Sequence, residues 1–116
     1  MMDGLLPQQS AMATFLAYLE QQREEYRYAI PARLADIDAL WSSIQRTSTE
    51  AKLLELERHA HSLAGSGAVF NFRKLGDAAK VLELAVQEKR QRGASLNLVE
   101  QVRIAYAIHE LHRAAA

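Results

Sequence analysis

The 116-residue chain is short enough for one domain, residues 1–116, and long enough to bury a core without a metal ion or disulfides. Lys plus Arg and Asp plus Glu each number 14, so the net charge is zero, which argues against a nucleic-acid-binding protein. Cysteine is absent, which excludes disulfides and thiolate nucleophiles, and no apolar run approaches the roughly 20 residues that span a bilayer.

The first ten residues, MMDGLLPQQS, show no secretory signal. They contain neither a basic segment nor a long apolar one. We therefore expect a cytoplasmic protein that does not associate with membranes.

The first half of the chain predicts two helices. Ser10 could cap the first helix, whose apolar positions are Met12, Phe15, Leu16, Leu19 and Tyr26. Pro31 should kink this helix or open the next one, whose apolar positions are Leu34, Ile37, Leu40, Trp41 and Ile44. The polar residues 46–49 then predict a turn and a new cap.

The second half predicts three more helices, at residues 50–66, 72–92 and 95–113, with Gly93 placed to stop the second of them. The apolar stripe of the last helix is predicted to contain Leu98, Val102, Ala105, Ile108 and Leu111. Val, Ile and Thr are sparse, whereas Ala, Leu, Glu, Gln and Arg are common, which favours helices over strands. We therefore expect an all-α fold, an antiparallel four-helix bundle with an additional N-terminal helical segment.

His61 is predicted to point away from the core. The apolar stripe of the helix predicted at residues 50–66 contains Leu53, Leu56, Ala60 and Leu63, and Gly67, directly after the helix, continues it. At about 100° per residue, His61 lies roughly 120° from the centre of this stripe. Gly65, one turn later, lies on the same outward side, where a glycine costs about 1 kcal/mol relative to alanine. Access of a partner to the imidazole would explain that glycine.

Residues 61–72, HSLAGSGAVFNF, resemble the signature H-x-(L/I)-K-G-(S/G)-(A/S)-(A/G)-x-(F/L)-G of histidine-containing phosphotransfer (HPt) domains. They look especially like the phosphorylated N-terminal domain of chemotaxis histidine kinases. The resemblance implies that His61 exchanges a phosphoryl group with the aspartate of a response-regulator receiver domain, or receives it from a histidine kinase. The receiver would supply Mg²⁺, so this chain would need no cofactor of its own. The resemblance also implies that it is a monomer and acts as a phosphocarrier. It contains no Gly-rich nucleotide loop, which excludes an autonomous kinase.

The resemblance also assigns a role to Glu83, 22 residues after His61. The related chemotaxis domains have a glutamate at this spacing that accepts a hydrogen bond from the histidine ring. If Glu83 accepts from Nδ1–H, Nε2 is left as the nucleophile. The alternative is an ordinary solvated glutamate.

The chain departs from the family pattern at Ala64, where a lysine is usual. In an antiparallel helix pair that brings His61 opposite Glu83, position 64 faces Lys80, so the Lys80 ammonium could restore the missing positive charge. The alternative is that Lys80 extends into solvent. Asn71 stands where the family prefers glycine, and asparagine tolerates the left-handed conformation that this turn could require.

A partner is expected to contact the surface around His61, formed by Leu54, Arg58, Ala64 and Gly65. Leu54 could instead pack under the N-terminal helix. Because of Ala64, the chain could also be a docking module that binds a receiver or kinase and transfers little phosphate. A third possibility is a structural bundle whose motif is coincidental.

The other three histidines give only weak signals for a site. His59 is two residues from His61, so the two cannot chelate one metal ion from an unbroken helix. His109 and His112 have a suitable spacing, but no third ligand accompanies them. We therefore expect no metal site.

Overall fold

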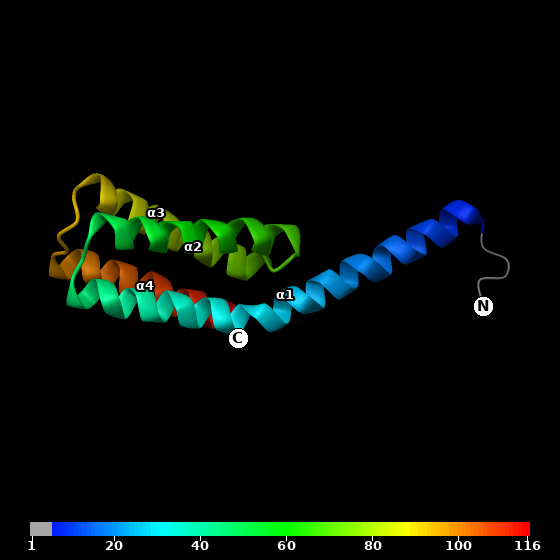
Figure 1. Ribbon diagram of the computed structural model, residues 1–116, viewed down its shortest axis with the longest axis horizontal. Helices are drawn as coiled ribbons and strands as arrows, with labels where there is room; N and C mark the ends of the chain where they lie inside the picture. Colours follow the sequence, from blue (N-terminus) through cyan, green and yellow to red (C-terminus); the bar gives the residue numbers. More distant parts are fainter. Residues whose placement is uncertain (1–5) are drawn as a thin grey trace. The chain divides into compact units, whose positions relative to one another are not determined.

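The computed structural model describes residues 6–116, in which the chain forms four helices. They are α1 (Pro7–Arg46), α2 (Glu50–Val69), α3 (Arg73–Gln91) and α4 (Leu98–Ala115), and the described residues contain no strand. The chain divides at Ile30 and Pro31 into two compact units. The second unit contains residues 31–46 of α1 together with α2, α3 and α4, which form the predicted all-helical bundle (Figure 1). That both units belong to one domain stays a prediction.

The two helices predicted for the first half of the chain are a single helix. α1 begins at Pro7, so the prediction that Ser10 caps it is wrong. Proline suits the first turn of a helix because its φ is fixed near the helical value and no N–H is needed there. The helix also continues through Pro31 to Arg46, so Pro31 does not open a new helix. The additional N-terminal segment is thus the part of α1 that precedes Pro31.

The N-terminal unit exposes most of its predicted apolar face. Tyr26 and Ile30 are buried, but the earlier positions of this face are 41–56% exposed, namely Met12, Phe15, Leu16 and Leu19. Periodicity therefore identified the apolar side of this helix and not how much of it is covered. None of the helices within residues 6–116 is long and apolar enough to cross a bilayer.

The core of the second unit is apolar and contains residues of all four helices. The stripe predicted for α2 is confirmed, since its buried residues are Leu53, Leu56, Ala60, Leu63 and Gly67. The large side chains that are almost completely buried in this unit are Ile37, Ile44, Leu53, Leu56, Leu63, Leu75, Leu82, Val86, Ile104 and Leu111. His61 follows Ala60 of this stripe and is turned out of the core by the helical repeat.

The stripe predicted for α4 is partly wrong. Its buried residues are Ile104, Ala107, Ile108 and Leu111, whereas Leu98 is 74% and Val102 is 59% exposed. α4 carries apolar residues on more than one side, so the pattern allowed two registers that differ by a rotation of the helix. The helix also begins at Leu98 and not at residue 95, because Asn97 and Glu100 form a capping box there.

α2 and α3 approach each other closely at two glycines. A Cβ atom on Gly67 would lie 2.9 Å from Cα of Gly76, which leaves no room for a side chain at Gly67, and a Cβ atom on Gly76 would lie 3.2 Å from the Ala64 carbonyl oxygen. α2 continues to Val69, three residues beyond its predicted end, and Asn71 in the following turn has a φ of 62°. The left-handed conformation anticipated for Asn71 is therefore present. This contact and turn set the two helices side by side along their length (Figure 1).

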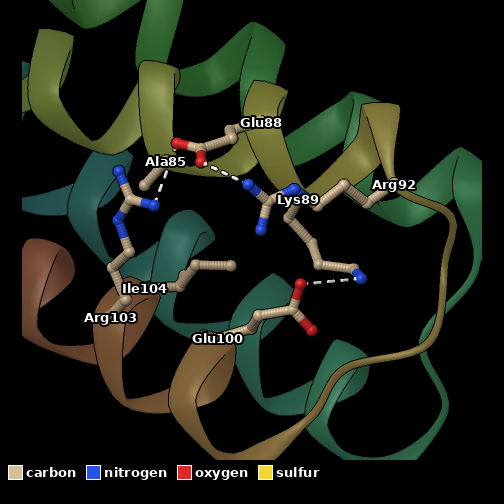
Figure 2. A pocket seen from close by; sticks show the side chains of 7 residues that line it. All are labelled: Ala85, Glu88, Lys89, Arg92, Glu100, Arg103 and Ile104. Carbon is tan, nitrogen blue, oxygen red and sulfur yellow. Dashed lines mark hydrogen bonds and ion pairs between the residues drawn. The ribbon is translucent and has the colours of Figure 1, made fainter.

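Ion pairs fix the other end of α3. Arg90 contacts Glu57 of α2 through Nε at 2.9 Å and also reaches Glu50. Figure 2 shows the side facing α4, where the buried Lys89 ammonium lies 2.9 Å from the carboxylate of Glu100. α3 is thus held against α2 and α4 at this end and against α2 at the glycines. Glu83 lies on α3 between these two contact points, which defines its position.

Candidate functional site

His61 presents its ring on the surface of the second unit and is held there by a buried carboxylate. The His61 side chain is 74% exposed, whereas that of Glu83, on α3, is only 11% exposed. Oε2 of Glu83 lies 2.6 Å from Nδ1 of His61. One edge of the imidazole is therefore fixed by a hydrogen bond, while the rest of the ring is open to solvent.

Glu83 receives a second hydrogen bond from Lys80, one turn earlier on α3. The Lys80 ammonium lies 3.1 Å from Oε1, the carboxylate oxygen that does not contact His61. Burial acts to raise the pKa of Glu83, but the hydrogen bonds from Lys80 and His61, together with their charges, outweigh it and lower the pKa below its ordinary value.

The ionised state of Glu83 determines which ring nitrogen of His61 carries the hydrogen. An ionised carboxylate can only accept hydrogen bonds, so Nδ1 of His61 must donate. In the neutral ring Nε2 then bears the free lone pair. The arrangement selects one tautomer and leaves a potential nucleophile on the exposed part of the ring.

Lys80 and Ala64 line the same surface hollow, next to the His61–Glu83 pair. The other lining residues come from the end of α2, the turn and the start of α3, and are Ala68, Asn71, Arg73, Gly76 and Asp77. The Lys80 side chain is 56% exposed, but its ammonium is bonded to Glu83. The region beside Ala64 is thus bordered by a cation from α3.

The four residues predicted to contact a partner differ in exposure. Gly65 is exposed, and a Cβ atom built there would meet no other atom within 4 Å. Arg58 is also exposed, whereas Ala64 and Leu54 are half-buried. The surface next to His61 is therefore open above Gly65. A contact of any of these residues with a partner stays a prediction.

A second cation near His61 was not identified from the sequence. Arg33, on α1, places Nη2 3.2 Å from the hydroxyl of Ser62 and Nη1 3.2 Å from that of Ser66. The Ser66 hydroxyl donates to the Ser62 carbonyl at 2.8 Å, which leaves its lone pairs directed at the guanidinium. Two serines one turn apart are the only sequence signal, and they do not reveal which residue of α1 opposes them.

The other three histidines contact more exposed groups. His59 Nε2 lies 3.9 Å from a Glu55 carboxylate that is 61% exposed. His112 Nε2 lies 2.9 Å from Asp38, while the His109 ring lies 6.5 Å from the ring of Tyr106. Within residues 6–116 no three His, Asp or Glu side chains are grouped so that they could hold a metal ion. His61 therefore differs from the others in having a buried carboxylate partner.

Comparison with known protein families gives a match over almost the whole chain. A family model described as "Hpt domain" matches residues 10–115, almost the whole chain, and this range contains His61, Glu83, Lys80 and Arg33. No curated protein and no solved structure matches the chain significantly.

Proposed function

The chain belongs to the Hpt domain family, and from this premise we propose that it is the phosphocarrier of a two-component phosphorelay, with His61 as phosphoacceptor. Its partners would be a response-regulator receiver domain, a histidine kinase, or both. The proposal is carried by the open imidazole of His61 and its 2.6 Å hydrogen bond to the buried carboxylate of Glu83. A histidine with an ordinary structural role would not need both features.

The proposed reaction is an in-line transfer between the receiver's aspartyl phosphate and Nε2. The Nε2 lone pair attacks phosphorus, so a P–N bond forms while the P–O bond to the aspartate breaks and the aspartate leaves as a carboxylate. The ring becomes a phosphoimidazolium, and its Nδ1–H remains hydrogen-bonded to Glu83, whose negative charge stabilises it. Donation to another receiver is the same reaction in reverse. Mg²⁺ held by the receiver would offset the charge of the phosphoryl oxygens.

We assign Lys80 and Glu83 to the orientation and charge of the site. Lys80 helps keep Glu83 ionised and brings a cation to the hollow beside Ala64, where the family usually has a lysine. The partner would approach over Gly65, with Leu54, Arg58 and Ala64 in the surface that it contacts. The open space above Gly65 supports this direction of approach.

A second candidate function follows from Ala64. Without the usual lysine, the chain could dock a receiver or kinase and transfer little phosphate. The two functions predict the same complex and differ in whether phosphate appears on His61.

A phosphotransfer assay separates these functions. The chain is incubated with a panel of phosphorylated receivers, and acid-labile, base-stable phosphate is measured on the wild type and on His61→Gln. His59→Gln is the matched control, because His59 lies on the same helix and also has a glutamate partner. We expect transfer to the wild type and to His59→Gln, and none to His61→Gln. Binding without transfer to any of the three would favour the docking module, and transfer to His61→Gln would exclude His61 as the acceptor.

A further inference from the structure

His61 lies on a ridge of α2 between two neighbouring helices. On one side, Ala64 and Glu57 face α3: Ala64 lines a hollow with Lys80, and Glu57 binds Arg90. On the other side, Ser62 and Ser66 face α1, because their hydroxyls contact Arg33. At about 100° per residue, Gly65 projects between His61 and these two serines. Within residues 61–66, Gly65 is thus the residue between His61 and the Arg33 contact, and it has no side chain.

The hydrogen bond to Glu83 determines which way the ring faces. Nδ1 points to α3, where Glu83 lies, and Nε2 is separated from Nδ1 by one ring carbon. Nε2 is therefore directed away from Glu83 and Lys80. A phosphoryl group on Nε2 would therefore lie on the side of the ring opposite Glu83, and the Lys80 ammonium, bonded to Glu83, would lie behind the ring.

Arg33 is suited to reach such a phosphoryl group. Its guanidinium is a permanent cation, and its contacts include the neutral hydroxyls of Ser62 and Ser66. One serine directly follows His61, and the other is one turn further along α2. The planar guanidinium can exchange two hydroxyl acceptors for two phosphoryl oxygens, since its paired N–H groups fit either.

We propose that Arg33 is the residue of this chain that binds the phosphoryl group on His61, and that Ser62 and Ser66 hold it in place before transfer. This inference rests on the proposed function, since it needs a phosphoryl group on His61. In this proposal, two cations with different roles together replace the lysine that the family usually has at the position of Ala64. Lys80 acts on Glu83, and Arg33 acts on the phosphate itself.

The test compares Arg33→Gln and Arg33→Lys with the wild type and with Arg113→Gln. Arg113 is a control because it is an exposed arginine on α4 that pairs with Glu110 of the same helix. Each protein is phosphorylated by a phosphorylated receiver and, separately, by phosphoramidate, from which the phosphoryl group passes to Nε2 and ammonia leaves. The rate of transfer, the rate of hydrolysis and the ³¹P chemical shift of the phosphohistidine are measured, together with thermal unfolding.

We expect Arg33→Gln to slow receiver-dependent transfer about tenfold or more, because a charge-assisted contact is lost, and to move the ³¹P signal. Arg33→Lys should show a smaller change of both, and Arg113→Gln should match the wild type. If Arg33→Gln does not fold, Arg33→Lys decides by the same two measurements. Wild-type rates and shifts in the folded variants would overturn the role of Arg33 while leaving the phosphocarrier intact. A wild type that accepts no phosphate on His61 would instead refute the proposed function.

Discussion

Glu83 links the chemistry of the proposed site to the stability of the fold. Its carboxylate is buried and accepts hydrogen bonds from His61 and Lys80, and the resulting pKa lies below the ordinary value of 4.5. Because the folded pKa is lowered, Glu83 stabilises the fold above the pKa it has in the unfolded chain. This contribution is lost as the pH falls through the folded value.

Glu83→Gln should therefore alter both transfer and acid sensitivity. Glutamine is neutral, so it cannot stabilise a positively charged phosphoimidazolium, and we expect transfer to fall by about tenfold or more. The wild type should be the more stable protein at neutral pH, and its advantage should shrink as the pH drops below about 4.5, since only the wild type loses the charge of Glu83. Urea unfolding of both proteins at several pH values measures this. A constant difference at all pH values would contradict the role given to Glu83.

Sequence reasoning predicted some residues of the proposed site and did not predict Arg33. His61 and Gly65 follow from helical periodicity, and Glu83 from its spacing in the family that residues 61–72 resemble. Arg33 could not be predicted in this way. Its contacts join residues 29 and 33 positions apart, and helix periodicity does not define which residue of α1 opposes Ser62.

At the scale of elements, the crossing of α2 and α3 depends on Gly67 and Gly76. We predict that Gly67→Ala destabilises the protein by about 1–3 kcal/mol, since the new methyl group would press against the backbone of Gly76 and Phe72. Displacement of α3 should also move Glu83 and slow transfer. Chemical unfolding and the transfer assay check both effects.

Gly65→Ala is the matched control for this prediction. It lies on the same helix, and a Cβ atom there meets nothing within 4 Å. We expect it to stabilise the protein by up to about 1 kcal/mol through helix propensity alone. The two substitutions should therefore shift the unfolding midpoint in opposite directions. A similar loss in both would mean that the close approach of the helices is not what Gly67 provides.

The start of α4 allows a second test at this scale. Asn97 accepts from the Glu100 N–H, and the Glu100 side chain accepts from the Asn97 N–H. We expect Asn97→Ala to cost about 1 kcal/mol of stability and Ser95→Ala, two residues earlier, to cost little. Denaturant unfolding of the two variants compares them, and an equal loss would show that the helix start is not stabilised by this capping box.

The same helix shows why its core face was mispredicted. The predicted helix begins at residue 95 although the sequence contains the capping box N-x-x-E at residues 97–100, and the predicted apolar stripe begins at Leu98. Leu98 and Val102 are apolar but exposed, so apolar character alone did not separate the covered side from the open one. The core face of α2 was predicted correctly, because its buried residues are those of the predicted stripe.

At the scale of the molecule, the helical composition and periodicity were sufficient to predict a four-helix bundle, but not its division into units. The continuity of α1 was left open, because proline usually interrupts a helix and Pro31 could have kinked this helix or opened the next one. The helix tolerates Pro31 at the point where the two units meet in the sequence.

All residues assigned to the site lie after this point, so we predict that a chain beginning at Pro31 keeps the phosphotransfer activity. His61, Glu83, Lys80 and Arg33 belong to the second unit, and Pro31 is well suited to the first turn of a shortened helix. Circular dichroism should still show a cooperative helical fold, and transfer from a phosphorylated receiver should proceed at the rate of the full chain. A truncated protein that folds but accepts phosphate far more slowly would show that residues before Pro31 contribute to partner binding or to the site.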